Sequence, residues 1–172
     1  MKILVTGGAG FIGSQVADAY IENAHDVVLV DNLSTGRKEN VNPKAKLYEI
    51  DITDKNIFQI FKDEKFDFVN HHAAQIDVRK SVADPVYDAN VNILGTINIL
   101  ESCVKAGVKK VIFASTGGAV YGEQEYFPAD ENHPVKPLSP YGITKLCIEK
   151  YLHFYKIEYG LEYSILRYAN VY

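Results

Sequence analysis

A tyrosine and a lysine, Tyr141 and Lys145, form the pair of side chains in this sequence best suited to proton chemistry. Residues at positions i and i+4 leave the same face of a helix, and Pro140 marks the start of a predicted one. A phenol with a pKa of about 10 is a poor base at neutral pH, but a lysine ammonium and a nicotinamide cation nearby favour the phenolate. The pair predicts a general base for a sugar or alcohol hydroxyl, against the alternative of packing on a helix surface.

Two adjacent hydroxyls, Ser115 and Thr116, follow a predicted strand at the edge where open α/β sheets bind their ligands. Either hydroxyl could bridge the base and a substrate oxygen. The alternative for each is a role in a turn or as a helix cap.

A glycine cluster near the amino end contains Gly7, Gly10 and Gly13 between a predicted strand and a predicted helix. Without Cβ atoms the turn is tight, and a pyrophosphate can approach the backbone and the unpaired N–H groups of the helix. The context therefore predicts a dinucleotide site, and a structural turn without a ligand is the alternative.

Two aspartates follow the second and third predicted strands. Asp31 lies where a carboxylate accepts hydrogen bonds from the adenosine ribose, which favours NAD over NADP, although Arg37 could receive a 2′-phosphate. Asp51 could contact the adenine amino group or simply cap a helix. An ordinary solvated turn is the alternative for Asp31.

The elements that must position these residues alternate between short β-branched runs and longer segments of helical period, which predicts a Rossmann-type doubly wound parallel sheet with helices on both faces. We expect one α/β domain over residues 1–172. The segment 122–139 contains three prolines and is predicted to be a functional loop or a simple connection. The predicted strands are 2–6, 26–30, 46–50, 66–70, 110–114 and 163–167, and the predicted helices are 11–23, 54–63, 84–106 and 140–159.

Composition restricts the partners. The formal charge of −4 and the absence of a dense basic stripe argue against a nucleic acid or an anionic membrane and favour a small soluble substrate. No run reaches the roughly 20 apolar residues that span a bilayer. Cys103 and Cys147 are expected to be reduced thiols of a cytoplasmic protein, and His71 and His72 diverge on a strand end rather than forming a metal site.

The motifs together resemble the extended short-chain dehydrogenase/reductases that act on nucleotide sugars, and most closely the UDP-glucose 4-epimerases. The resemblance runs along essentially the whole chain. The matching stretches are Thr6–Gly13, Asp31–Gly36, Asp51–Ile52, His72–Gln75, Asn90, Ser115–Gly122, Ser139–Lys145 and Arg167–Tyr172.

The resemblance assigns further residues to an NAD site. Phe11 and Ile12 would join the glycines at the pyrophosphate, Asn32 would flank the ribose, and Ile52 would join Asp51 at the adenine. The nicotinamide pocket would be formed by Ala73, Ala74, Gln75, Asn90, Tyr141 and Lys145.

The resemblance also implies the reaction. Thr116 is the first choice for the hydroxyl that assists Tyr141, with Ser115 in reserve. Related dehydratases carry an Asp-Glu pair after this threonine, where the present chain has Gly117 and Gly118. The implied function is NAD-dependent epimerisation at C4 of a UDP-sugar, in galactose metabolism, through a transient 4-keto intermediate.

Two alternatives stay open: another nucleotide-sugar epimerase or dehydratase of the same family, and a non-catalytic NAD-binding fragment. Members of the family carry a carboxy-terminal substrate domain that is absent from residues 1–172. They also pair as homodimers through two long helices, which correspond here to 84–106 and 140–159.

Overall fold

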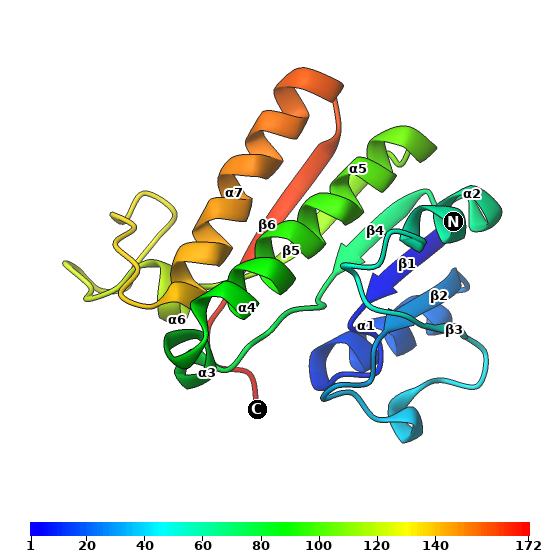
Figure 1. The fold of residues 1–172 in the computed structure, drawn as a ribbon, viewed down its shortest axis with the longest axis horizontal. Helices are drawn as coiled ribbons and strands as arrows, with labels where there is room; N and C mark the ends of the chain where they lie inside the picture. The colour runs from blue at the N-terminus through cyan, green and yellow to red at the C-terminus, as the bar shows by residue number, and fades with distance from the viewer.

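The computed structural model describes all residues from 1 to 172 and shows one six-stranded sheet (Figure 1). The strand order is β3-β2-β1-β4-β5-β6, and every neighbouring pair is parallel. The order reverses between β1 and β4, the switch point where doubly wound sheets bind ligands at the carboxyl ends of their strands. The strands are β1 (Lys2–Thr6), β2 (Asp26–Asp31), β3 (Lys46–Glu49), β4 (Phe68–His71), β5 (Lys110–Thr116) and β6 (Glu162–Tyr168).

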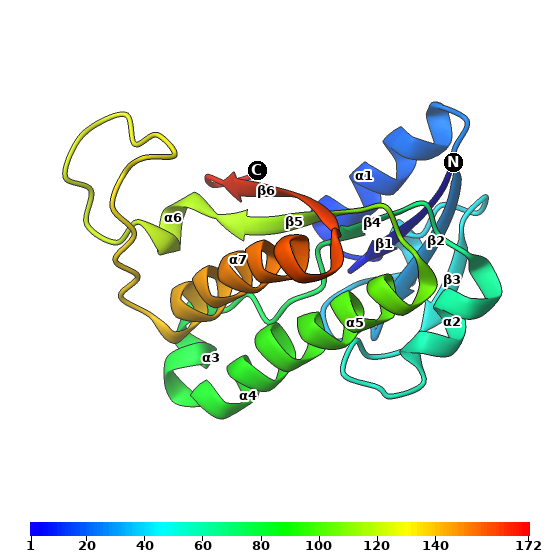
Figure 2. The same cartoon turned by 90° about the horizontal axis from the view of Figure 1, so that it is seen from above.

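Helices connect the strands and cover the sheet. Figure 2 shows α1 on one face, and α2, α5 and α7 on the other. The predicted fold class, a Rossmann-type doubly wound parallel sheet with helices on both faces, is confirmed. The helices are α1 (Phe11–Glu22), α2 (Ile57–Glu64), α3 (Val78–Ala83), α4 (Pro85–Ala89), α5 (Thr96–Ala106), α6 (Gly117–Val120) and α7 (Pro140–Tyr159).

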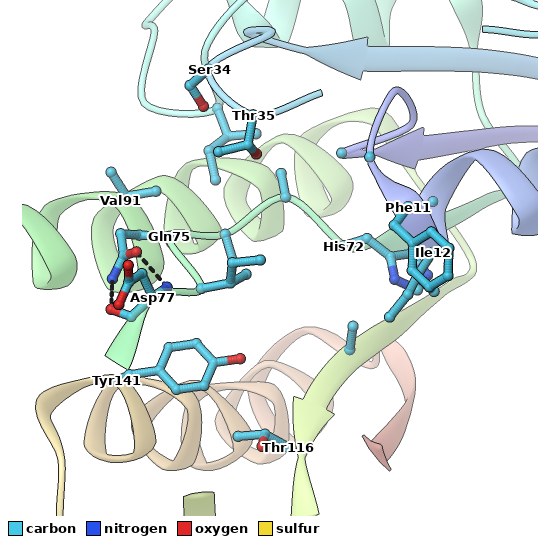
Figure 3. A pocket seen from close by; sticks show the side chains of 18 of the residues that line it. Phe11, Ile12, Ser34, Thr35, His72, Gln75, Asp77, Val91, Thr116 and Tyr141 are labelled. Carbon is cyan, nitrogen blue, oxygen red and sulfur yellow. Dashed lines mark hydrogen bonds between the residues drawn. The ribbon is translucent and has the colours of Figure 1, made fainter. Parts of the chain in front are cut away.

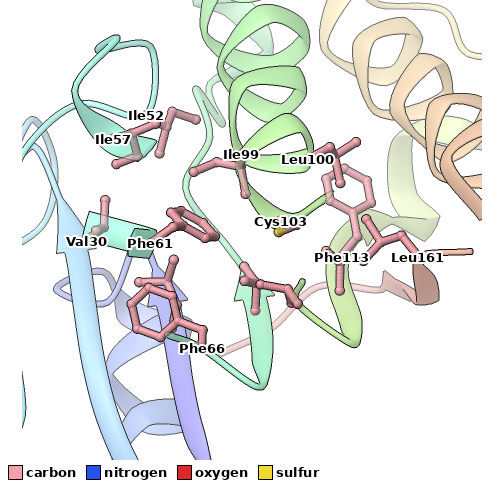
Figure 4. Packing of buried hydrophobic residues seen from close by; sticks show 14 of the residues in the cluster. Val30, Ile52, Ile57, Phe61, Phe66, Ile99, Leu100, Cys103, Phe113 and Leu161 are labelled. Atoms are coloured by element: carbon pink, nitrogen blue, oxygen red, sulfur yellow. The ribbon is translucent and has the colours of Figure 1, made fainter. Parts of the chain in front are cut away.

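The alternation of side chains along β1 divides the core between the two faces of the sheet. Ile3 and Val5 pack toward α1, whereas Leu4 belongs to the larger cluster under α2, α5 and α7. In that larger cluster, the rings of Phe61 and Phe66 meet edge to face with centroids 5.3 Å apart (Figure 4). This packing holds α2 against the residues that precede β4.

The predicted helix 84–106 contains a break in its hydrogen-bond pattern. It forms α4, then a π-helical turn at Asn90–Gly95, then α5. A π turn inserts an extra residue into the helix and so changes which side chains share a face. The short helices α3 and α6 were not predicted, because segments of six and four residues are too short to show a helical period.

Local chemistry sets the start and the end of α7, the helix that carries Tyr141 and Lys145. The hydroxyl of Ser139 accepts a hydrogen bond from the amide of Gly142 at 3.2 Å, and Pro140 occupies the first helical turn. Gly160 ends the helix with a left-handed φ of 70°. The capping residue thus holds Tyr141 in the first turn, next to the sheet edge.

Candidate active site

A cavity of about 660 Å³ opens at the carboxyl ends of the strands, around the switch point between β1 and β4. It brings together residues from both halves of the sequence, including Ser115 and Thr116 (Figure 3). The residues expected at the cofactor also line it, apart from Asn90: Gly7, Gly10, Phe11, Ile12, Gly13, Asp31, Asn32, Asp51, Ile52, Ala73, Ala74, Gln75, Tyr141 and Lys145.

The glycine turn leaves no room for side chains. Gly7 has a left-handed φ of 68°, and a Cβ atom on Gly13 would lie 2.1 Å from the carbonyl oxygen of Gly7. The helix that follows, α1, has no side-chain cap, because its N-cap residue is Gly10, and its first turn holds no acidic residue. The first amides of an uncapped helix are unpaired and lie at the positive end of its dipole, so this wall of the cavity suits an anion.

The carboxylate of Asp31 is held by the backbone at the end of β2. It accepts hydrogen bonds from the amides of Ala9, at 2.9 Å, and Leu33, at 2.8 Å. Asp31 is buried but still lines the cavity. The carboxylate thus joins the glycine turn to the β2 end and keeps lone pairs for a ligand hydroxyl.

Asp51 and Asn32 form a second polar group on the same wall. The amide nitrogen of Asn32 donates to Asp51 at 2.6 Å, and the backbone and hydroxyl of Thr53 donate to the other carboxylate oxygen. Burial raises the pKa of Asp51, but the hydrogen bonds from Thr53 and Asn32 outweigh it and lower the pKa overall. Asp51 is therefore an ionised acceptor at neutral pH.

Tyr141 extends its ring from α7 into the cavity. Gln75 and Asp77 lie on the opposite wall (Figure 3). The ammonium of Lys145 lies 5.9 Å from the centre of this ring and donates to the carbonyl oxygen of Ala114 at 2.9 Å. Burial lowers the pKa of Lys145 to about 8. A cation beside the phenol is the arrangement that the spacing of the pair predicts.

The protein groups alone do not produce a phenolate. Burial, followed by the charge of Asp88, raises the pKa of Tyr141 above its ordinary value. The ammonium of Lys145 donates to a backbone carbonyl rather than to the phenol, and it is only one of the two cations that the sequence predicts beside Tyr141. A second positive charge in the cavity is needed to favour the ionised form.

The two hydroxyls at the end of β5 differ in their surroundings. Ser115 is buried, and its hydroxyl donates to Glu149 at 2.6 Å, while Glu149 is also paired with Arg167. Thr116 makes no side-chain hydrogen bond to the protein and lies in the cavity wall. Successive residues of a strand point to opposite faces, so the two hydroxyls have different neighbours. Because the proton of Ser115 is committed to Glu149, only Thr116 has a proton available to a ligand.

Asn90 does not reach the cavity; it is exposed at the start of the π-helical turn. The neighbouring Asn92 is buried instead and makes two hydrogen bonds to the backbone of Gln75, at 2.8 and 3.0 Å. The irregular helix puts Asn92 rather than Asn90 on the inner face. Sequence reasoning missed Asn92 because the π turn is not visible in the residue pattern.

His71 connects three elements behind the cavity. Thr96 donates its hydroxyl proton to the carbonyl of Asn92 at 2.7 Å, so it accepts from Nε2 of His71 at 2.9 Å. The Nδ1 atom then accepts from Thr6 at 2.6 Å, and Thr6 in turn accepts from the amide of Ala73 at 3.2 Å. Each hydroxyl proton has one acceptor, which fixes His71 as a neutral ring protonated on Nε2.

Both adjacent histidines resist protonation. Burial, with the charge of Lys145 added, lowers the pKa of His71 to about 3 and that of His72 to about 4. His72 stacks on Tyr168, and its Nε2 atom is buried without a hydrogen-bond partner. The two rings point to opposite faces of the sheet, as predicted, since one contacts Thr96 and the other Tyr168.

We predict that the fold loses stability as the pH falls from 7 to 5. A histidine whose pKa is depressed in the native state binds its proton only in the unfolded chain, so acid favours unfolding below the unfolded pKa of about 6.5. Each of the two histidines contributes about 2 kcal/mol to this loss. Urea unfolding at the two pH values measures it.

The matched variants for that experiment are His72→Phe and His153→Gln. Phenylalanine keeps the stacking on Tyr168 and should remove about half of the pH dependence. His153 is exposed on α7 and its replacement should leave the dependence unchanged. An unfolding free energy that is the same at pH 7 and pH 5 would contradict the expected burial of both rings.

Several cavity residues were not singled out from the sequence. Ser34 and Thr35 belong to the motif Asp31–Gly36, and Tyr168–Val171 belong to the motif Arg167–Tyr172. The quoted motifs therefore already contained these residues. Nothing in the local sequence indicates the others, which reach the cavity only through the fold. These are Ile50, Ile76, Asp77, Lys80, Tyr87, Val91 and Ala114, whereas His72 belongs to the quoted motif His72–Gln75.

Three further observations concern metal-binding groups, membrane-spanning helices and cysteines. No group of three or more His, Cys, Asp or Glu side chains has a geometry that could hold a metal ion. No helix has both the length and the apolar character needed to cross a bilayer. Cys103 is buried and Cys147 partly buried, and both are free thiols.

The fold and the cavity at its switch point define a Rossmann-type doubly wound domain. Residues 3–172 match the NAD dependent epimerase/dehydratase family, and the chain belongs to that family. A UDP-glucose 4-epimerase of Mycolicibacterium smegmatis is 42% identical over 177 residues, which cover 100% of this chain and 56% of that protein. The chain thus spans about half the length of the curated relatives it matches.

Solved structures show the same likeness. The UDP-glucose 4-epimerase of Thermotoga maritima, determined with UDP-glucose, superposes with a TM-score of 0.98 at 52% identity. The UDP-glucose 4-epimerase of Thermus thermophilus, in complex with NAD, superposes with a TM-score of 0.97 at 46% identity. In both comparisons the match covers 100% of this chain and 56% of the other.

Proposed function

We propose that this chain is the NAD-binding catalytic portion of an enzyme that inverts C4 of a UDP-sugar, interconverting UDP-glucose and UDP-galactose. The single observation that supports this most is that Tyr141, Lys145 and Thr116 share one cavity with the glycine turn and Asp31. The similarity to UDP-glucose 4-epimerases along the whole chain supports the same reaction.

The residues present fit NAD. The backbone at Gly7 and Gly13 approaches too closely for any Cβ atom, and the uncapped start of α1 offers amides to a pyrophosphate. Asp31 would accept from the ribose hydroxyls, Asn32 and Asp51 would contact the adenosine end, and Ala73, Ala74 and Gln75 would flank the nicotinamide. NAD+ would supply the hydride acceptor for C4 of the sugar, and its positive ring would add the second cation that Tyr141 needs.

The side chains of this cavity divide the proton chemistry among them. Tyr141 would take the proton of the sugar 4-hydroxyl and would return it to the same oxygen after the 4-keto sugar has turned its other face to the cofactor. Lys145 would stabilise the phenolate and bind the nicotinamide ribose. Thr116, whose hydroxyl has no protein partner, would hydrogen-bond the reacting oxygen, whereas the proton of Ser115 is committed to Glu149.

The cavity offers little for elimination of water. Gly117 and Gly118 occupy the positions where dehydratases carry an acid and a base. Asp77 reaches the cavity wall, but its carboxylate caps α3 by accepting from the amides of Arg79 and Lys80. A 4-keto sugar held here would therefore be reduced again rather than dehydrated.

Turnover and cofactor binding by the purified 172-residue chain test the proposal together. We expect the chain to convert UDP-galactose to UDP-glucose if a further domain of its longer relatives is dispensable. Product analysis with UDP-N-acetylgalactosamine and UDP-galacturonate distinguishes this enzyme from epimerases that act on other UDP-sugars. Calorimetry with NAD and NADP should show tighter binding of NAD, because a 2′-phosphate would meet Asp31. A chain that binds neither dinucleotide would overturn the proposal.

We propose that residues 1–172 form one dinucleotide-binding domain and that the rest of the sugar site comes from a further domain in longer relatives. The share of each relative that the chain covers supports this division. NAD binding without turnover is the result expected if that domain is needed. We also propose that the enzyme acts in the cytoplasm and that its reaction belongs to galactose metabolism.

We predict a homodimer that forms through the outer faces of the two helical segments 84–106 and 140–159. Their longest helices, α5 and α7, run side by side (Figures 1 and 2). Leu94, Ile143 and Phe154 expose 59%, 54% and 48% of their surface there. Pairing two copies would bury these apolar side chains. Analytical ultracentrifugation should show twice the monomer mass, and Phe154→Glu should shift the equilibrium to monomer. Sedimentation of the unmodified chain as a monomer only would contradict the dimer.

A further inference from the structure

Asp88 is a buried acid without an ionic partner. It lies in α4, directly before the π-helical turn, and has 0% of its surface exposed. No lysine or arginine forms an ion pair with it. Burying an unpaired charge is costly unless hydrogen bonds compensate for the lost water, so such a group is retained where it has a specific task.

Hydrogen bonds from three elements converge on this carboxylate. One oxygen accepts from the side-chain amides of Gln75, at 2.9 Å, and Asn92, at 3.0 Å. The other accepts from the hydroxyl of Thr144 at 3.0 Å. Gln75 lines the nicotinamide side of the cavity, and Thr144 precedes Lys145 on α7. The carboxylate thus joins the loop after β4, the π-helical turn and the catalytic helix.

The charge of Asp88 also acts on the two groups of the proposed proton chemistry. Burial lowers the pKa of Lys145 and Asp88 opposes that change, so the acid favours the ammonium. Burial raises the pKa of Tyr141 and Asp88 adds to that change, so the acid favours the neutral phenol. The other ionisable groups nearby are Tyr141 itself and the neutral rings of His71 and His72. Glu149, one turn further along α7, is neutralised by its ion pair with Arg167 at 2.6 Å.

We propose that Asp88 is a positioning residue of the site: its carboxylate holds Gln75 and the start of α7 in place and brings a buried negative charge beside Thr144, the residue that precedes Lys145. This role rests on the proposed function, in which Lys145 acts as a cation beside Tyr141. The carboxylate favours that cation but does not itself favour the phenolate, because its charge raises the pKa of Tyr141. The π-helical turn at Asn90–Gly95 follows Asp88 directly and places Asn92 beside the same carboxylate.

The variant Asp88→Asn separates the charge from the hydrogen bonds. Its oxygen can still accept from Gln75 and Asn92, and its amide can donate to Thr144, whose proton is free to turn to the carbonyl of Tyr141 at 2.9 Å. In the 172-residue chain without cofactor, the Lys145 titration is followed through its ¹³Cε resonance, assigned from the spectrum of Lys145→Met. We expect its midpoint to fall by about one pH unit or more in Asp88→Asn.

The matched control is Asp84→Asn, the same change one turn earlier. Asp84 is the exposed N-cap of α4, and asparagine caps a helix as well as aspartate does. A second variant, Thr144→Val, removes one hydrogen bond to Asp88 and keeps the charge. Neither change should move the Lys145 midpoint by more than about 0.3 pH unit, because Thr144→Val keeps the charge of Asp88, and Asp84 is not among the groups that shift the pKa of Lys145.

The outcomes are distinct from those that test the epimerase proposal, because the titration needs neither NAD nor sugar. A folded Asp88→Asn chain with an unchanged Lys145 midpoint would overturn the role of the charge. If this variant does not fold, Asp88→Ser provides a second chain without the charge. Failure of both to fold would identify Asp88 as a structural anchor only and overturn the proposal.

Discussion

Replacing Tyr141 by phenylalanine is expected to lower the conversion of UDP-galactose to UDP-glucose by about 10³-fold, with NAD binding nearly unchanged. A positioned general base contributes about 10²–10⁴ in rate, and phenylalanine removes the only phenol that extends into the cavity from α7 beside Lys145. The ring itself is kept, so the shape of the cavity and the cofactor contacts are preserved. Steady-state kinetics and calorimetry on the same preparation measure the two effects.

The matched control is Tyr151→Phe, the same change on the same helix at an outward-facing position. It should leave both turnover and NAD binding as they are. Both variants are made in a protein that contains residues 1–172 and has measurable turnover, so that a loss of activity can be detected. Unchanged turnover in Tyr141→Phe would remove Tyr141 from the reaction, and an equal loss in Tyr151→Phe would point to general damage to α7.

Replacing Gly13 by alanine is expected to weaken NAD binding by about 100-fold or more, equivalent to about 2.7 kcal/mol. The added Cβ atom would lie 2.1 Å from the carbonyl oxygen of Gly7 and 2.9 Å from its carbonyl carbon. The turn must open to relieve this contact, which moves the amides of α1 away from the pyrophosphate. Isothermal titration calorimetry gives the affinity, and thermal unfolding gives the accompanying loss of stability.

Two other glycines provide the comparison. At Gly10 the Cβ atom would approach the same carbonyl oxygen at 3.2 Å, so Gly10→Ala should weaken NAD binding less than Gly13→Ala. At Gly160 the Cβ atom meets nothing, but φ is +70°, so Gly160→Ala should cost about 1 kcal/mol of stability without affecting NAD. Wild-type affinity in Gly13→Ala would show that the turn does not bind the cofactor.

Much of the fold could be predicted because the elements that matter most obey local rules. β1 and α7 have the predicted bounds, since a short apolar run before glycine and a Ser-Pro start are strong local signals. The α2 helix begins at Ile57 rather than at Asp54, because Asp54 forms a turn with the amide of Asn56 instead. Phe66 packs in the core before β4 begins at Phe68, so an apolar residue was mistaken for part of the strand.

Local sequence patterns are enough to predict three parts of the site: the glycine turn, the acid at the end of β2, and the tyrosine and lysine one turn apart. These features depend on backbone geometry within a few residues, which is why they can be read before the fold is known. The three-dimensional contacts are needed to learn which hydroxyl is available, which asparagine faces inward, and what surrounds Lys145. Thr116, Asn92 and Asp88 depend on strand alternation, a π turn and contacts between residues as far apart as Asp88 and Thr144, and such long-range contacts leave no mark on any local stretch of sequence.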